Sequence, residues 1–315
     1  MKYNKNLNSP LALHNEAKKL GKKVISNSQI KSYKQCPHKW KTMYIDGNKE
    51  YQPSIFFVFG TAIHETLQEF LRVMYSKTAK AAEELDLPEI LKKEMFKAYN
   101  IAVKRNHGEH FTTKYDLEDI YKQGLEILSF FIKKRGAYFS KRNTELLGIE
   151  VPIFIESDVN ENVLIGGFLD IVMKEGEKIK IYDIKTSYKT WDKAKKKAGS
   201  FQLRLYKKYF AKNYDVELED IEIEFFIVKR IIYENSDFPQ SRIQTFSPAS
   251  GKPTMKKVGN EVDEFITAVF NEDGSYNTNR EYKAIAGVNR SNCKYCPFKT
   301  NYDLCPKENR IKQDD

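Results

Sequence analysis

The chain has 315 residues and a formal charge of +10, from 53 lysines and arginines against 43 aspartates and glutamates. Its hydrophobic content of 41% and aromatic content of 13% can fill a core, which excludes wholesale disorder. Its apolar runs are far shorter than the roughly 20 residues that span a bilayer, and the segment from Met1 to Leu20 lacks the apolar stretch of a secretory leader. We therefore expect a cytoplasmic protein with no membrane partner. Its lysine- and asparagine-rich composition suggests a bacterial or viral source, and its positive charge favours nucleic acid as the partner.

The N-terminal half is expected to be helical after a polar lead-in. Residues 1–25 are lysine-rich, and we expect them to contribute no core. Ser28 is the predicted N-cap of the next helix, which places Ile30 and Tyr33 on its buried side. Helical spacing of apolar residues predicts three further helices, over 61–75, 84–102 and 116–135. Gly136 is expected to lie just past the last of them.

The hydrophobic period changes near residue 145. Three β-branched, apolar runs separated by polar turns predict a meander of strands, over 145–156, 163–174 and 178–186. A helix over 200–214 and a strand over 221–233 follow. We expect residues 235–260 to form a surface loop and 261–270 to form a last helix. The order of elements predicts an α/β fold with a helical insertion before its sheet.

Two carboxylates and an ammonium group lie close to the ends of adjacent predicted strands. Asp170 and Asp183 can converge there on one hard cation, and Lys185 is on the same strand face as Asp183 because side chains alternate along a strand. A metal ion between two carboxylates lowers the pKa of bound water and neutralises phosphate, and a lysine stabilises developing charge, as phosphodiester hydrolysis requires. The alternative is a solvated hairpin with ordinary surface residues. A D-x-K triplet taken alone favours this alternative.

Three other features support the hydrolytic interpretation. His64 lies four residues after Gly60 near a helix start, and imidazole suits Mn²⁺ better than Mg²⁺, although a structural histidine is the alternative. Gln202 and Tyr206 share one helical face, where they either contact a phosphate or base or simply pack. A basic loop with one aromatic ring either contacts DNA or is merely solvated. Its residues are Lys189, Trp191, Lys193, Lys195, Lys196 and Lys197.

The chain has only four cysteines, and three of them lie close together near its end. They are Cys36, Cys293, Cys296 and Cys305. A disulfide framework suits small secreted domains and not this chain, whereas four thiols suit a single metal centre. Structural zinc sites usually use two close cysteine pairs, while here one pair is flanked by two single cysteines, which favours iron–sulfur over zinc. Cys36 as a plain buried thiol is the remaining alternative.

Six motifs occur in a fixed order along the chain: Ser26-x-Ser28…Tyr33-x2-Cys36-Pro37, Gly60-x3-His64, Gly167-x2-Asp170, Asp183-x-Lys185-Thr186-Ser187, Gln202-x3-Tyr206 and Cys293-x2-Cys296-Pro297-x7-Cys305-Pro306. In this order they resemble the PD-(D/E)XK nuclease superfamily, in its RecB-like branch with an iron–sulfur cluster. That branch includes the AddB nuclease domain and the CRISPR-associated RecB-like exonucleases. The last cysteine spacing is longer than in the commonest pattern of that branch.

The resemblance implies a restriction-endonuclease-like core, which is a mixed central sheet flanked by helices. One nuclease domain would cover 26–306, with a lead-in before it and a tail over 307–315. Within the domain, the resemblance implies a helical part, a catalytic sheet core and an iron–sulfur segment joined to Cys36, over about 61–140, 145–234 and 288–306.

The resemblance also implies a role for each motif residue. His64, Asp170 and Asp183 would bind a catalytic Mg²⁺ or Mn²⁺, together with the backbone carbonyl of Ile184. Lys185 would be the catalytic lysine, and Gln202 and Tyr206 the additional catalytic motif that follows it. The four cysteines, Cys36, Cys293, Cys296 and Cys305, would hold a [4Fe–4S] cluster.

We therefore expect a metal-dependent DNA exonuclease that acts on single strands or DNA ends in replication, recombination or repair. A structure-specific endonuclease and a non-catalytic DNA-binding protein are the alternatives. No Walker A sequence occurs in the chain, so a helicase or recombination protein would be a separate partner.

Overall fold

The computed structural model describes residues 3–48, 50–232 and 240–311, and the chain groups into two compact units. Unit 1 comprises Met1–Asn4, Pro53–Pro152 and Phe168–Met255. Unit 2 comprises Lys5–Gln52, Ile153–Gly167 and Lys256–Asp315. The single nuclease domain expected over 26–306 stays a prediction.

Unit 1 contains the four longest helices of the described chain and the short helix α5. They are α4 (Ile55–Ser76), α5 (Ala79–Glu83), α6 (Leu87–Arg105), α7 (Lys114–Tyr138) and α8 (Lys193–Tyr214). Helix α4 begins earlier than its apolar pattern predicts because the Ser54 side chain accepts a hydrogen bond from the Phe56 backbone N–H. The expected end of α7 before Gly136 is wrong. The helix continues to Tyr138, whose ring packs edge-on against Phe226 at 5.2 Å between centroids, and this packing stabilises the last turn.

The strands of unit 1 form a mixed sheet. They are parts of β2 (Thr144–Glu156) and β3 (Val163–Glu175), with β4 (Lys178–Ser187), β5 (Ile221–Lys229) and β6 (Ile243–Phe246). The order is β3-β4-β5-β6, with β2 also paired to β3. Neighbours β3 and β4 are antiparallel, β4 and β5 parallel, and β5 and β6 antiparallel. The three strands predicted over 145–186 are therefore confirmed.

The surface loop expected over 235–260 is wrong over the part that the structure describes. Strand β6 pairs with β5 there, and Ile243 is buried opposite Val228. Helix α9 (Lys252–Val269) then begins earlier than the expected 261. The strand expected over 221–233 ends earlier, at Lys229. Residues 233–239 lie outside the described residues.

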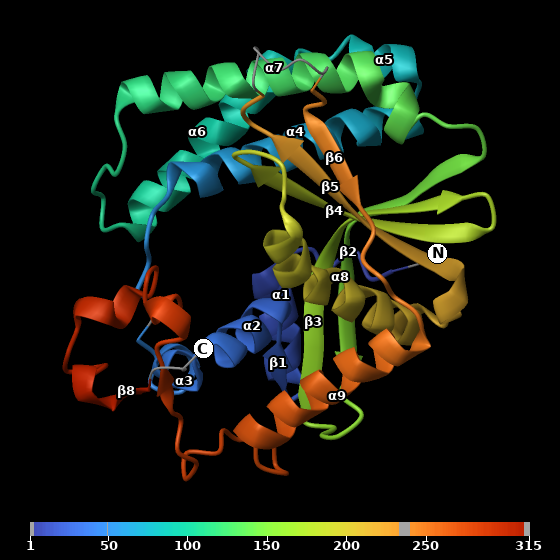
Figure 1. The fold of residues 1–315 in the computed structure, drawn as a ribbon. Coiled ribbons are helices and arrows are strands. Elements are labelled where there is room, and N and C mark those ends of the chain that lie inside the picture. The colour runs from blue at the N-terminus through green and yellow to red at the C-terminus, as the bar shows by residue number, and fades with distance from the viewer. Residues whose placement is uncertain (1–2, 49, 233–239, 312–315) are drawn as a thin grey trace. The chain divides into compact units, whose positions relative to one another are not determined.

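Helices cover both faces of this sheet. Helices α4, α6 and α7 lie together over β4, β5 and β6 (Figure 1), and their apolar side chains share one core with Phe226 and Val228 of β5. The next side chain along β5, Phe225, points to the opposite face, where it packs against Trp191 just before α8. Strand β4 is accordingly buried along its centre, as expected for a strand covered on both faces.

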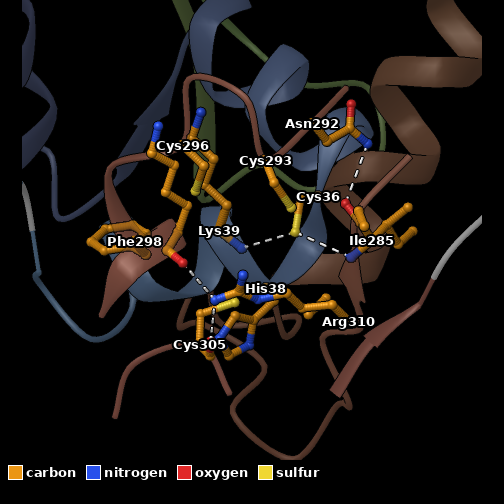
Figure 2. Close-up of a pocket in the computed structure, with 13 residues that line it drawn as sticks. Cys36, His38, Lys39, Ile285, Asn292, Cys293, Cys296, Phe298, Cys305 and Arg310 are labelled. Carbon is orange, nitrogen blue, oxygen red and sulfur yellow. Dashed lines mark hydrogen bonds between the residues drawn. The ribbon is translucent and has the colours of Figure 1, made fainter. Parts of the chain in front are cut away.

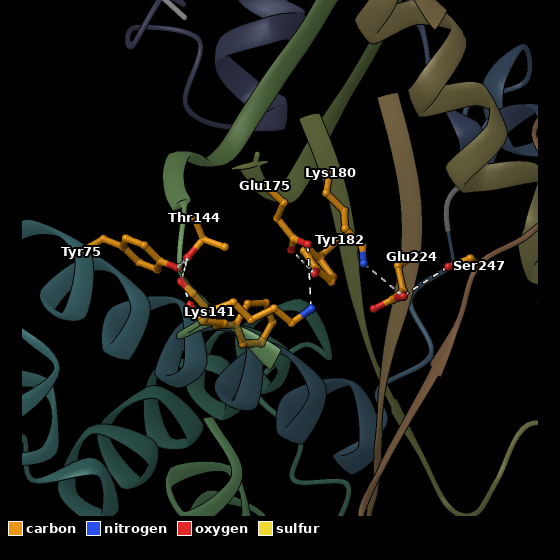
Figure 3. A network of polar contacts seen from close by, with 9 residues as sticks. Tyr75, Lys141, Thr144, Glu175, Lys180, Tyr182, Glu224 and Ser247 are labelled. Carbon is orange, nitrogen blue, oxygen red and sulfur yellow. Dashed lines mark hydrogen bonds and ion pairs between the residues drawn. The ribbon is translucent and has the colours of Figure 1, made fainter. Parts of the chain in front are cut away.

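A polar network crosses the strands of unit 1 (Figure 3). The Tyr182 hydroxyl donates to Glu175 at 2.5 Å, and burial together with this carboxylate raises the pKa of the phenol. Lys180 lies 3.3 Å from Glu224, and its ammonium group is 4.9 Å from the centroid of the Tyr182 ring. These contacts join β3, β4 and β5 side by side. They hold the strand that carries Asp183 in register.

Unit 2 begins with structure that the sequence did not predict. Helix α1 (Pro10–Lys19) and strand β1 (Lys23–Ile25) occupy the expected lead-in, and β1 pairs in parallel with the first residues of β3. Ser9 caps α1, and Leu13 and Ala17, four residues apart, bury one face of it. A short helix with only two deeply buried side chains carries a weak periodic signal, which explains the wrong expectation.

The rest of unit 2 is built largely on helices. These are α2 (Asn27–Gln35), α3 (Pro37–Tyr44) and most of α9, followed by η2 (Val288–Arg290), η3 (Pro297–Thr300) and η4 (Lys307–Asn309). The N-cap of α2 is Ser26 and not the predicted Ser28. Trp40 is fully buried among the rings of Tyr33, Phe265 and Tyr282.

Two short strands close the described part of unit 2. They are β7 (Ala284–Ile285) and β8 (Arg310–Ile311), and they pair in parallel, so the start of the expected tail over 307–315 is structured. Among the described residues, no helix has the length and apolarity to cross a membrane.

Candidate active site and cysteine cluster

The structure brings Asp170, Asp183 and Lys185 together in unit 1. Ile171 pairs with Tyr182 across the antiparallel β3–β4 ladder, so Asp170 and Asp183 are the next residues along it. The Ile184 backbone N–H donates to Asp170 Oδ2 at 2.7 Å, and Lys185 Nζ lies 2.6 Å from Asp183 Oδ2. Strand pairing thus produces the convergence that the sequence pattern predicts.

His64 of α4 reaches the same place. Its Nδ1 lies 3.5 Å from Asp170 Oδ2. A Cβ atom on Gly60 would come within 3.2 Å of Thr186 Oγ1, so a glycine here allows the close approach of α4 to β4. Burial, followed by the charge of Lys185, lowers the pKa of His64 to about 4. The imidazole is therefore neutral near pH 7, which is the form that binds a metal ion.

Burial dominates the electrostatics of the acidic pair. It raises the pKa of Asp170 to about 7 and that of Asp183 to about 6, although the charge of Lys185 opposes both shifts. For Lys185 the balance is reversed: burial would lower its pKa, but Asp183 and Asp170 raise it overall. The site consequently holds two carboxyl groups whose charged forms are destabilised by burial, and one cation.

Two residues at this site were missed by the sequence analysis. The Gln68 side-chain amide donates to Glu150 Oε1 at 2.7 Å and to the Asp170 backbone carbonyl at 3.1 Å. Glu150 adopts φ +50° inside β2, a left-handed conformation that is uncommon for a residue with a side chain, and burial raises its pKa. The one available signal was the spacing of Gln68, four residues after His64 on the same helical face.

Gln202 and Tyr206 of α8 meet each other as their spacing predicts. Gln202 Nε2 donates to the Tyr206 hydroxyl at 3.2 Å. Tyr206 is buried, and burial, followed by the charge of Asp183, raises the pKa of its phenol. The charges of the acidic pair therefore act on the phenol, which stays protonated near pH 7.

The basic segment is not a loop over most of its length. Lys193, Lys195, Lys196 and Lys197 lie in the first turns of α8, where Asp192 caps the helix by accepting from the Lys195 backbone N–H at 2.8 Å. The apolar periodicity of the sequence does not predict this helix start, because the residues in its first turns are mostly exposed. Trp191 packs against Phe225 at 5.2 Å between ring centroids, which makes it a weak candidate for stacking on a base. DNA contact by these residues stays a prediction.

The acidic site offers several oxygen and nitrogen donors to a divalent cation. As the side chains stand, no group of three or more His, Cys, Asp or Glu residues is arranged to hold a metal ion within the described ranges. Asp183 Oδ1 is nevertheless buried without a hydrogen-bond partner, and Asp183 Oδ2 has only the Lys185 ammonium group at 2.6 Å. An unpartnered carboxylate oxygen beside a second carboxylate and a neutral imidazole suits Mg²⁺ or Mn²⁺. The donor set fits such an ion.

The four cysteines line one cavity in unit 2 (Figure 2). All four are free thiols. Cys36 lies between α2 and α3, and its sulfur accepts from the backbone N–H groups of Lys39 at 3.5 Å and Ile285 at 3.3 Å.

Contacts between distant segments hold this cavity together. A ring nitrogen of His38 lies 2.7 Å from the Leu304 carbonyl, and Asn292 donates to the Gln35 carbonyl at 2.6 Å. Arg310 donates to the Cys305 carbonyl at 2.6 Å, which places a cation beside the thiols. Burial raises the pKa of the Cys293 and Cys296 thiols. A metal centre here would have to displace their protons.

Comparison with known proteins identifies the family. Residues 24–305 match the PD-(D/E)XK nuclease superfamily. A solved structure titled "Crystal structure of SSO0001" is 14% identical, with coverage of 83% of this chain and 92% of that chain, but its TM-score of 0.29 supports no argument. No curated protein matches. Because the matched range covers most of the chain, including the acidic site and the cysteines, the chain belongs to the PD-(D/E)XK nuclease superfamily.

Proposed function

We propose that the protein is a metal-dependent DNA exonuclease that acts on single strands or on DNA ends. Membership of the superfamily supports a metal-dependent nuclease, and DNA is the substrate that the family implies. The observation that carries the proposal is the buried pair Asp170 and Asp183 beside Lys185, with Asp183 Oδ1 left without a hydrogen-bond partner. A buried polar group without a partner is costly, and a divalent cation would offset that cost.

The chain's own residues have distinct parts in hydrolysis. His64, Asp170, Asp183 and the Ile184 carbonyl would hold Mg²⁺ or Mn²⁺, which would acidify a water molecule and neutralise the phosphate. Lys185 keeps its positive charge because of the adjacent carboxylates, and it stabilises the negative charge that develops on the phosphate oxygens. Tyr206 and Gln202, on the adjacent helix, position the scissile phosphate.

Cleavage of linear against covalently closed DNA tests the exonuclease proposal. An exonuclease degrades linear single strands in Mn²⁺ and leaves closed circular single strands intact. Cleavage of the circles would instead support a structure-specific endonuclease. Binding without cleavage of either substrate would support a non-catalytic DNA-binding protein. A separate helicase would be the natural supplier of single strands to such an enzyme.

We also propose that Cys36, Cys293, Cys296 and Cys305 hold a [4Fe–4S] cluster, as in the RecB-like branch. Their shared cavity and the two backbone N–H groups directed at the Cys36 sulfur support this assignment. Protein purified without oxygen should be brown and absorb visible light. Colourless protein with one zinc ion per chain would favour the zinc alternative.

A further inference from the structure

Two exposed aromatic rings of unit 1 contact one cation. The guanidinium carbon of Arg230 lies 4.3 Å from the centroid of the Phe56 ring and 5.4 Å from that of Tyr188. Phe56 is 54% exposed and Tyr188 is 55% exposed, so each ring keeps an open surface after this contact. We call Phe56, Tyr188 and Arg230 the aromatic–arginine surface.

The backbone of the sheet brings these residues together. Tyr188 directly follows β4, and Arg230 directly follows β5. The Arg230 N–H donates to the Ser187 carbonyl at 2.8 Å, and the Ile231 N–H donates to the Tyr188 carbonyl at 3.1 Å, so the parallel pairing continues past both strands. Phe56 arrives from the first turn of α4, the helix that carries His64. The surface is therefore fixed by the same elements as the acidic site.

The spacing along these elements places the surface near the acidic site. Tyr188 is three residues beyond Lys185, which corresponds to about 10 Å at ~3.3 Å per strand residue. Phe56 is eight residues before His64, which corresponds to about 12 Å at ~1.5 Å per helix residue. Both lengths run along the elements alone, because Tyr188 is on the face of β4 opposite Lys185. A single strand of a few nucleotides spans them.

The chemistry of the surface favours an unpaired base. Aromatic rings beside a cation bind the face of a base and its phosphate together, and every base has such a face. The guanidinium beside the rings adds a positive charge, and the chain's formal charge of +10 also suits a polyanion. In a duplex the base faces are already stacked on one another. The surface can therefore recognise a base only in a single strand.

We propose that Phe56, Tyr188 and Arg230 bind an unpaired base of the strand that enters the acidic site, and so select single strands over duplex. The inference rests on the proposed function, because it assumes that a DNA strand occupies that site. The rings of Phe56 and Tyr188 are exposed, whereas the Trp191 ring packs against Phe225.

Binding measurements without cleavage test the inference. They use the Lys185→Ala protein in EDTA, with a labelled oligothymidylate and a blunt duplex. Phe56→Ala and Tyr188→Ala should each weaken single-strand binding by about 5- to 100-fold, the range expected for the loss of one base stack. Duplex affinity and melting temperature should not change. Phe96→Ala removes an aromatic ring that is 69% exposed on α6 and serves as the matched control.

An abasic nucleotide moved along the oligothymidylate identifies stacking directly. The parent protein should lose affinity when the abasic nucleotide occupies the position near the surface, while the Phe56→Ala/Tyr188→Ala protein should show no additional loss there. The Phe56→Trp protein should keep full affinity. Unchanged single-strand binding in the double variant, additive losses with the abasic strand, or an equal loss of duplex binding would each overturn the inference.

The test separates this inference from the proposed function. Binding as expected, together with a wild-type protein that cleaves no DNA in Mg²⁺ or Mn²⁺, would refute the nuclease proposal alone. Cleavage of linear single strands with unaltered binding by the double variant would refute the stacking surface alone.

Discussion

Replacing Asp170 with Asn should abolish cleavage and yet stabilise the metal-free protein. Asp170 is 14% exposed, and burial raises its pKa from 3.8 to about 7. Each pKa unit corresponds to ~1.36 kcal/mol, so ionisation of this carboxyl lowers the free energy of unfolding by up to about 4 kcal/mol above pH 7. An asparagine carries no charge and can still accept the hydrogen bond from Ile184 that measures 2.7 Å.

The sign of the pH dependence follows from the same shift. The folded chain binds a proton on Asp170 more tightly than the unfolded chain does. Between about pH 4 and pH 7 the folded state therefore carries more protons, and the free energy of unfolding falls as pH rises through this window. Asp170→Asn should remove this part of the slope, whereas Asp183, whose pKa is raised to about 6, retains its own share.

Urea unfolding in EDTA at about pH 8 and about pH 4.5 measures the effect. At the higher pH the variant should be more stable than wild type by roughly 2–4 kcal/mol, and the difference should shrink at the lower pH. Mn²⁺ should then stabilise wild type but not the variant, since only a ligand that binds the folded state shifts the equilibrium.

Asp116→Asn is a control of opposite sign. Hydrogen bonds from Thr113 and Thr112 lower the pKa of Asp116, so its carboxylate stabilises the fold above its unfolded pKa. Its replacement should destabilise the protein near pH 7 and have less effect in acid. The reasoning about Asp170 is refuted if Asp170→Asn destabilises the metal-free protein near pH 8 and leaves the slope unchanged.

Three further predictions concern catalysis, DNA and the cysteines. Lys185→Ala should abolish cleavage in Mg²⁺ and Mn²⁺ and nearly preserve DNA affinity, because it removes charge stabilisation in the transition state. Single-turnover rates within a few-fold of wild type would contradict the assignment of Lys185 as the catalytic lysine. Replacing Lys193, Lys195, Lys196 and Lys197 by Ala should weaken DNA binding and flatten its salt dependence, since each phosphate contact releases about one counterion. An unchanged slope in a salt titration would mean that these side chains do not contact DNA. Cys36→Ala should give colourless protein with a protease-sensitive segment beyond about residue 285, because folding of that segment and binding of the metal centre are coupled. Brown, fully active protein with the wild-type melting temperature would mean that Cys36 is not a ligand.

The amino-acid pattern determined the parts of the fold that depend on local alternation. The strands around Asp170 and Asp183 were predictable because β-branched runs with a period of two are interrupted by polar turns. The shared strand face of Asp183 and Lys185, and the shared helix face of Gln202 and Tyr206, follow from the geometry of single elements. Residue type alone also indicated that the four cysteines belong to one site.

Tertiary structure decided what joins distant segments. The start of α8 at Lys193, the pairing of β6 and the burial of α1 depend on contacts with other elements, which outweigh weak local signals. The link from Gln68 to Glu150 and the meeting of Phe56, Tyr188 and Arg230 join residues that no spacing relates. Even the raised pKa of Asp170 is a tertiary property, because it comes from the removal of water by packed neighbours, which no sequence pattern encodes locally.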